Sequence, residues 1–126
     1  MESLLYATGA IPRKGSVKDG NSVGDSVAEA RERQMSTELS VAHTEFLGDE
    51  WAFVDCPGSV ELAQESYQAL LACDVAVVVC EPAAEKAVSL TPTFRYLQAH
   101  SIPFMVFINK MDQATQSVES VMDALQ

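Results

Sequence analysis

The 126-residue sequence is poor in basic side chains, with eight Lys and Arg residues against 18 Asp and Glu residues. Its formal net charge is −10. Proteins that bind nucleic acid directly neutralise phosphates with clustered Lys and Arg, so we expect this acidic segment not to bind nucleic acid itself. Any nucleic-acid partner would be met through other parts of a larger assembly.

Long apolar runs and cysteine pairs are also lacking. No stretch approaches the roughly 18 apolar residues that a membrane-spanning helix needs. The start, "MESLLYATGAIPRKG", has an early acid and no basic stretch before an apolar run, so we expect no secretory signal. The three cysteines, Cys56, Cys73 and Cys80, form an odd set. They predict reduced, buried thiols in a cytoplasmic protein, not a disulfide framework or a metal site.

The pattern that is present is an alternation of strands and helices in one domain-sized chain. We predict helices over 3–9, 60–72, 91–100 and 115–126, strands over 39–48, 51–56, 74–82 and 102–110, and a loop over 12–26. Residues 27–38 form either a short charged helix or more of that loop. A tight turn at Asp49-Glu50 would join the first two strands. The run 74–82 is typical of a strand buried on both faces. These features predict an α/β fold, with a mostly parallel sheet and flanking helices, whose ligands lie beyond the carboxyl ends of the strands.

The first motif, "DCPG", lies at residues 55–58, directly after an apolar run. Asp55 would stand at the carboxyl end of its strand, where a carboxylate can reach an ion or a water. Gly58 lets the backbone approach a phosphate closely, and its N–H can donate to a phosphate oxygen. Pro57 restricts the turn. An ordinary turn is the alternative interpretation of this motif on its own.

The second motif, "NKMD", lies at residues 109–112, after the apolar run "IPFMVFI". The Asp112 carboxylate can accept hydrogen bonds from the N1–H and the exocyclic amine of guanine, a pattern that adenine lacks. Asn109 would tie the loop together, and the stem of Lys110 would lie against the base. A solvated polar loop is the alternative. The presence of both motifs at strand tips favours a guanine-nucleotide site.

These two motifs, together with the leading segment "ESLLYATGAIPRKGSVKDGNSVGDSVAEARERQMS", resemble the G domain of elongation-factor-G-like translational GTPases. The resemblance covers essentially the whole chain. It implies a P-loop NTPase-type sheet, binding of GTP or GDP and Mg²⁺, and GTP hydrolysis coupled to translocation or a related step on the ribosome, in the cytoplasm.

The resemblance also implies roles for individual residues. Asp55 would hold Mg²⁺ through a water, and Gly58 would sense the γ-phosphate. Asn109, Lys110 and Asp112 would select guanine.

The segment "ERQMST" resembles the switch sequence Glu-Arg-Gly-Ile-Thr of this family. The match places Ser36 at the position of the magnesium-binding threonine, with Thr37 as the alternative, and makes residues 12–38 a switch I loop. An ordinary polar loop residue is the other interpretation of Ser36.

Three departures from the family pattern alter these expectations. Ser59 stands where the family has a histidine that positions the attacking water, and a hydroxyl cannot take up an imidazole's role. No Gly-x-x-x-x-Gly-Lys-[Ser/Thr] sequence is present. The chain also stops at Gln126, ahead of the family's Ser-Ala loop. We therefore expect residues 1–126 to be a partial G domain that lacks the first and last strands and binds nucleotide weakly or not at all.

The first strand of the family sheet would lie between the strands that end at Asp55 and near Cys80. Without it, we expect those two strands to pair with each other or to self-associate with a second chain through their free edges. Because of Ser59, a second functional hypothesis also stays open. The domain could be a hydrolysis-deficient interaction module that contacts the ribosome or a protein partner.

Overall fold

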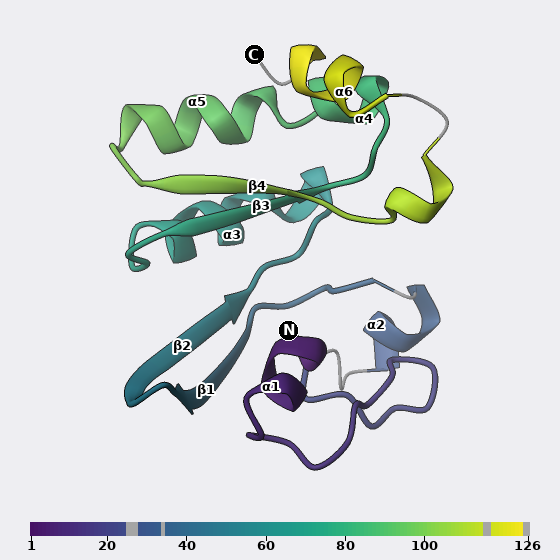
Figure 1. Ribbon diagram of the computed structural model, residues 1–126, viewed down its shortest axis with the longest axis vertical. Coiled ribbons are helices and arrows are strands. Elements are labelled where there is room, and N and C mark those ends of the chain that lie inside the picture. Colours follow the sequence, from purple (N-terminus) through teal and green to yellow (C-terminus); the bar gives the residue numbers. More distant parts are fainter. Residues whose placement is uncertain (25–27, 34, 115–116, 125–126) are drawn as a thin grey trace. The chain divides into compact units, whose positions relative to one another are not determined.

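The computed structural model describes residues 1–24, 28–33, 35–114 and 117–124, which fall into two units, Met1–Ala69 and Leu70–Gln126. Figure 1 shows their elements along the chain. In the first unit these are α1 (Glu2–Ala7), α2 (Ala28–Arg33), β1 (Ser40–Phe46), β2 (Asp49–Asp55) and the 3₁₀ helix η1 (Val60–Leu62), while α3 (Ala63–Leu70) runs to the boundary. In the second they are β3 (Ala76–Cys80), α4 (Ala84–Val88), α5 (Thr91–Ala99), β4 (Phe104–Ile108), the 3₁₀ helix η2 (Met111–Gln113) and α6 (Val118–Ala124).

Strands β1 and β2 form an antiparallel hairpin, as predicted, but the turn is not at Asp49-Glu50. The turn residues are Leu47 (φ 56°) and Gly48 (φ 88°), and β2 already begins at Asp49. Two consecutive positive φ values match the right-handed twist of a two-residue hairpin. Glycine accepts this backbone without strain, so the position of Gly48 sets the register and the predicted turn was two residues too late.

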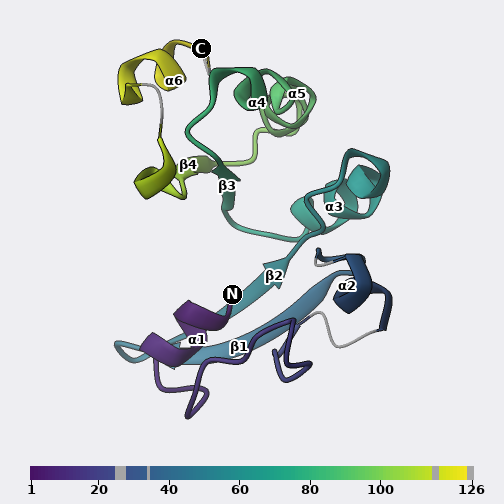
Figure 2. The same cartoon turned by 90° about the vertical axis from the view of Figure 1, so that its right-hand side faces the viewer.

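Helix α1 lies beside β1, as Figures 1 and 2 both show. Its Leu5 side chain is buried, and Gly9 (φ 78°), the last residue of the predicted helix, follows the Thr8 C-cap. The buried Thr44 hydroxyl of β1 donates to the Thr8 hydroxyl oxygen over 2.8 Å. The Thr8 hydroxyl lies 3.0 Å from the carbonyl oxygen of Leu4. A short polar network therefore joins the helix to the strand.

The segment after α1 is the predicted loop, and one side chain organises it. The Glu2 carboxylate accepts the backbone N–H of Gly15 over 2.9 Å and also that of Val23. The Asn21 side-chain oxygen accepts the N–H of Ser16 over 2.8 Å. These hydrogen bonds give a partner to backbone N–H groups that are not paired within a helix or a strand. Further along, α2 corresponds to the helical alternative predicted within residues 27–38.

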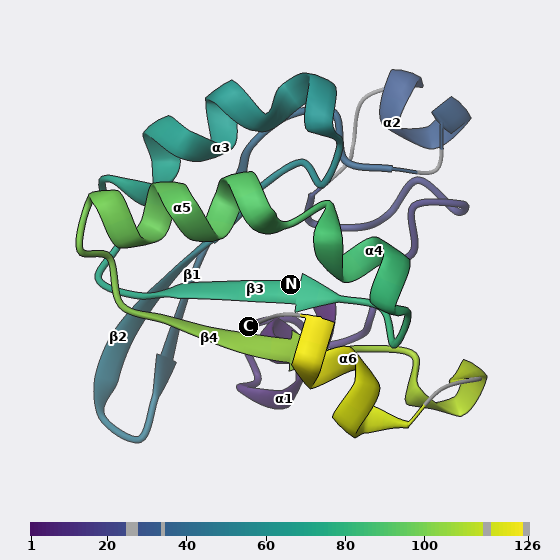
Figure 3. The same ribbon diagram turned by 90° about the horizontal axis from the view of Figure 1, so that it is seen from above.

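Strands β3 and β4 are parallel, with Ala76 opposite Phe104 and Cys80 opposite Ile108. Figure 3 shows the two strands side by side, with α5 running along them. The core of this unit centres on the fully buried Leu97 of α5. Its other members are Ala76, Val78, Leu70, Leu90, Phe94 and Ile102. Helix α5 (Thr91–Ala99) begins at the first residue of the helix predicted over 91–100, with Leu90 as its N-cap.

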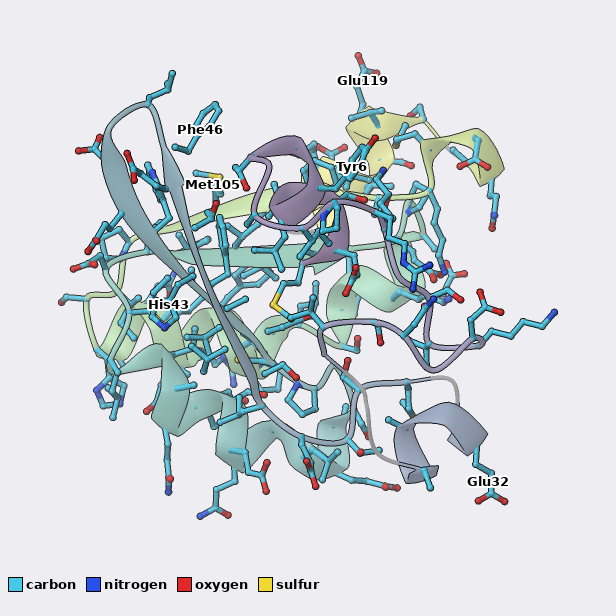
Figure 4. All side chains as sticks on the ribbon, turned by 90° about the horizontal axis from the view of Figure 1, so that it is seen from below. Tyr6, Glu32, His43, Phe46, Met105 and Glu119 are labelled. Carbon is cyan, nitrogen blue, oxygen red and sulfur yellow. The ribbon has the colours of Figure 1, made fainter. Side chains whose placement is uncertain are left out.

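One face of the β3–β4 sheet is exposed, so the prediction that β3 is buried on both faces is wrong. Burial alternates along β3, with Val77 54% and Val79 56% exposed. On β4, Met105 (labelled in Figure 4) is 57% and Phe107 58% exposed. The register places these side chains in cross-strand pairs on the same face. We call these four residues the exposed sheet face.

The helix predicted over 115–126 corresponds to α6, which packs against α4. Val121 is buried, whereas Val118 is 47% and Met122 44% exposed. Residues 115, 116, 125 and 126 of the predicted helix lie outside the described residues. None of the three cysteines forms a disulfide bond, but only Cys80 is buried as predicted, whereas Cys56 and Cys73 are half-buried. Burial raises the pKa of the Cys80 thiol, which disfavours its reactive thiolate form.

The fold is α/β with parallel strands except at the hairpin, which confirms the predicted class. The strands form two separate sheets, β1–β2 and β3–β4. None of the helices in the described part of the chain is long and apolar enough to cross a membrane.

Candidate functional site

The "DCPG" motif forms a strand–turn–helix junction. Asp55 is the last residue of β2 and is half-buried, and Pro57 is buried. The Ser66 hydroxyl of α3 donates to the Pro57 carbonyl oxygen over 3.2 Å, which fixes the turn to the helix that follows it. Ser59 is the N-cap of η1, and its carbonyl oxygen accepts the N–H of Leu62 over 3.0 Å. The junction thus presents a carboxylate at the strand tip, as predicted.

Gly58 is exposed, and the fold itself does not require a glycine there. A Cβ built on it would meet nothing within 4 Å, and its φ is not positive. By contrast, a Cβ on Gly15 would lie 2.2 Å from the backbone oxygen of Asn21. The space around Gly58 is therefore open to a group from outside the chain.

The "NKMD" motif forms a second turn, beyond the end of β4. The Asn109 N–H donates to the Cys80 carbonyl oxygen over 2.8 Å, which ties the start of this turn to the end of β3. Lys110 adopts a left-handed backbone (φ 58°, ψ 39°), which costs a residue with a side chain about 1–2 kcal/mol. Asp112 follows in η2, and its side chain is exposed. Strain of this kind persists where surrounding contacts fix the backbone, and it is frequent at ligand sites.

Sequence reasoning missed one residue at this turn, Glu81, which directly follows β3. Its Oε1 accepts a hydrogen bond from Nζ of Lys110 over 2.5 Å, and its Oε2 pairs with Nζ of Lys86 on α4. The hydrogen bond from Lys110, followed by that from Lys86, lowers the pKa of Glu81 to about 2. A lone glutamate after an apolar strand is the only sequence signal for this contact. Its partner is 29 residues further along the chain.

The candidate magnesium ligands of the switch segment lie in an irregular stretch between α2 and β1. Ser36 and Thr37 are both half-buried. Their hydroxyls and the Asp55 carboxylate are oxygen ligands, the kind that Mg²⁺ prefers. Within the described residues there is no group of three or more His, Cys, Asp and Glu side chains suited to a metal. Mg²⁺ needs only one or two protein ligands when phosphates and waters complete its shell, so this donor set fits it.

The site residues therefore form two local groups. Asp55, Pro57, Gly58 and Ser59 share one turn of the unit Met1–Ala69, to which Ser36 and Thr37 also belong. Asn109, Lys110 and Asp112 share one turn of the unit Leu70–Gln126. Each group lies at the carboxyl end of a strand, where ligands bind in sheets of this class.

Comparison with known proteins identifies the family. Residues 1–126 match the family described as Elongation factor Tu GTP binding domain. The chain is 48% identical over 125 residues to the elongation factor G-like protein of Synechocystis sp., covering 99% of this chain and 19% of that protein. It is 30% identical over 124 residues to the mitochondrial ribosome-releasing factor 2 of Danio rerio, covering 98% of this chain and 16% of that protein.

A crystal structure of a protein from Thermus thermophilus resembles the fold with a TM-score of 0.86 at 30% sequence identity. The likeness covers 97% of this chain and 18% of that one. The chain thus spans less than a fifth of the length of the curated relatives named here. Because the family match includes every residue, the chain belongs to the Elongation factor Tu GTP binding domain family. Its similarity to the elongation factor G-like protein of Synechocystis sp. agrees with the resemblance predicted from the sequence.

Proposed function

We propose that residues 1–126 form part of the GTP-binding domain of a longer cytoplasmic protein that hydrolyses GTP to GDP and phosphate during a ribosomal step of protein synthesis. Residues 12–38 would be its switch I loop. The observation that supports this most is the family match over the whole chain, combined with the position of both motifs at strand tips. The relatives, which include elongation and ribosome-releasing factors, support a role in translation.

Guanine would be recognised by the turn after β4. The Asp112 carboxylate accepts the N1–H and the exocyclic amine of the base, while the stem of Lys110 lies against the ring. Asn109 holds the turn through its backbone bond to β3. Adenine would leave the carboxylate unpaired, which makes polar recognition of this kind strongly selective. The exposure of Asp112 supports this role, because the base can reach its side chain from solvent.

The unit Met1–Ala69 would bind the phosphates and Mg²⁺. Asp55 would hold Mg²⁺ through a water, with Ser36, or alternatively Thr37, as a direct ligand. Gly58 would donate its backbone N–H to the γ-phosphate, and the open space around it supports such a close approach. When bound, the metal neutralises the charge that develops on the transferred phosphoryl group.

Ser59 favours a second candidate function. Hydrolysis requires a water that is held in line with the γ-phosphorus, and in this family a histidine positions it. The shorter Ser59 hydroxyl cannot take up that role, so hydrolysis would be slow unless another group replaces the imidazole. The second candidate is therefore a hydrolysis-deficient interaction module that contacts the ribosome or a protein partner through the same fold.

The partners of this domain follow from its charge and its free strand edges. With a net charge of −10, the segment would reach the ribosome through other parts of the longer protein and not through direct contacts with RNA.

On its own, the chain would self-associate through β2 and β3, whose outer edges lack a partner strand in the described structure. Size-exclusion chromatography with light scattering tests this point, and a stable monomer at high concentration would contradict it.

The guanine site can be tested on the chain itself by NMR, which detects millimolar binding. We expect GDP, but not ADP, to shift the backbone amide signals of Asn109, Lys110 and Asp112. The variant Asp112→Ala should lose this selectivity, because it lacks the accepting carboxylate. Asp123→Ala, which removes an exposed acid on α6, is the matched control and should behave like the unchanged chain. Equal shifts with GDP and ADP would refute the proposed base recognition.

Calorimetry with GTP and Mg²⁺ tests the expected weakness of binding. The chain contains no Gly-x-x-x-x-Gly-Lys-[Ser/Thr] sequence, whose amides and lysine supply most phosphate affinity in this class. We expect no tight binding, and submicromolar affinity would contradict this expectation.

The phosphate role of Gly58 needs a version fused behind the P-loop segment of a translational GTPase. In this fusion Gly58→Ala should weaken GTP binding more than GDP binding, because only GTP has the γ-phosphate. The variant should unfold at the same urea concentration as the parent, since its Cβ meets nothing within 4 Å. An equal effect on both nucleotides would contradict the assigned role.

The two candidate functions are separated by comparing that fusion with its Ser59→His variant in the presence of ribosomes. Brisk GTP turnover by the Ser59 form would refute the interaction-module alternative. Turnover that appears only in the histidine variant would support it.

A further inference from the structure

The contact that the proposed function leaves unexplained is the double ion pair of Glu81. Each oxygen of its carboxylate takes a different lysine: Oε1 takes Lys110 in the motif turn, and Oε2 takes Lys86 on α4. About one third of the Glu81 side chain is exposed, against half or more of each lysine side chain. The carboxylate thus lies at the junction of three elements, β3, α4 and the turn after β4.

This contact acts on the residue of the turn with the least favourable backbone. Lys110 has a left-handed conformation that glycine or asparagine would adopt more readily, so other contacts must hold it. Two are present. The backbone bond from Asn109 to Cys80 fixes the start of the turn, and the 2.5 Å bond to Glu81 fixes the far end of the Lys110 side chain. Because both the backbone and the ammonium group of Lys110 are held, its aliphatic stem has few accessible rotamers. It therefore loses less conformational entropy when a ligand packs on it.

We propose that Glu81 is a positioning residue for guanine recognition: its carboxylate holds the ammonium group of Lys110, and thereby orients the lysine stem and the turn in which Asp112 lies. This inference rests on the proposed function, because it assumes that the turn binds the base. Glu81 itself touches no ligand in this arrangement.

The charges around Glu81 determine how much this residue contributes to guanosine affinity. The carboxylate faces two ammonium groups, which also keep its pKa low and so keep it charged at every physiological pH. Because all three side chains are partly exposed, water and salt weaken the pairs, as for other surface ion pairs. Loss of Glu81 should therefore reduce guanosine affinity by about 2- to 5-fold, the range expected for an exposed ion pair.

The test measures binding of guanosine and adenosine to the whole chain by NMR titration, with three variants. Glu81→Gln keeps the size of the side chain but removes its charge. Glu85→Gln removes an exposed acid on α4 and is the matched control. Lys86→Gln removes the second lysine and leaves the bond to Lys110 in place. Nucleosides are used because they isolate base recognition from phosphate binding.

We expect Glu81→Gln alone to weaken guanosine binding, with adenosine binding unchanged and a smaller difference at 0.5 M salt. A role limited to general stability would change the urea midpoint and both nucleosides together. If Glu81→Gln binds guanosine as tightly as Glu85→Gln does, or more tightly, the inference is wrong while the proposed function stands. If the unchanged chain shows no preference for guanosine, the proposed function fails, and the inference fails with it.

Discussion

The fully buried Leu97 offers the most direct test of how the second unit is stabilised. Its side chain on α5 packs against Ala76 and Val78 of β3, and Phe94 on the same helix lies with its ring centroid 5.4 Å from that of Phe104. Leu97→Ala removes three carbons from this core. Their transfer to water accounts for about 2.4 kcal/mol. The cavity that remains raises the expected loss in the free energy of unfolding to about 3 kcal/mol.

The assay is urea unfolding followed by far-ultraviolet circular dichroism. For a chain of this size, the loss should lower the midpoint by about 1–3 M urea. Leu71→Ala is the control, because this side chain is 57% exposed and should change stability by less than about 0.5 kcal/mol. Leu97→Met keeps most of the volume and should cost less than about 1.5 kcal/mol. Leu97→Ala and Leu71→Ala variants of equal stability would refute this account of the core.

Three further predictions concern single contacts. Thr44→Val keeps the buried shape but removes the hydrogen bond to α1, and should cost about 1 kcal/mol in urea unfolding; a gain in stability would contradict the bond. Gly15→Ala places a Cβ 2.2 Å from the backbone oxygen of Asn21 and should cost about 1–3 kcal/mol, with faster amide exchange in residues 15–24; unchanged exchange would count against the crowding. The pKa of Glu81 falls on folding from 4.5 to about 2, so its stabilisation is present above pH 4.5 and is lost as the pH falls toward 2. The difference in stability between the unchanged chain and Glu81→Gln should therefore shrink over this range, and a pH-independent difference would contradict the ion pairs.

The sequence predicted the order and type of the main elements because hydrophobic periodicity and turn residues are local signals. The hairpin turn was misplaced because the acid pair Asp49-Glu50 resembles a turn in composition, whereas the backbone requirement for positive φ falls on Leu47 and Gly48. The exposure of Val77 was also missed, because a continuous apolar run looks the same whether or not another element covers its second face.

At the candidate site, the sequence located the residues of both turns but not the contact that supports one of them. The apolar runs located Asp55 at the end of β2 and Asn109 directly after β4, although the predicted strands, 51–56 and 102–110, continued past both observed strand ends. The pairing of Glu81 with Lys110 joins residues that follow two neighbouring parallel strands, and only the register of β3 against β4 brings them together. Long-range pairing of this kind has no local signature in a single sequence.

The exposed sheet face also affects how the folding of this chain can be followed. Dyes that fluoresce on contact with apolar surface usually signal a loosened, molten state. Here four large apolar side chains, Val77, Val79, Met105 and Phe107, are more than half exposed in the folded chain. Such a dye would therefore bind to the native protein and fluoresce. Near-ultraviolet circular dichroism or amide exchange would report intact packing more reliably.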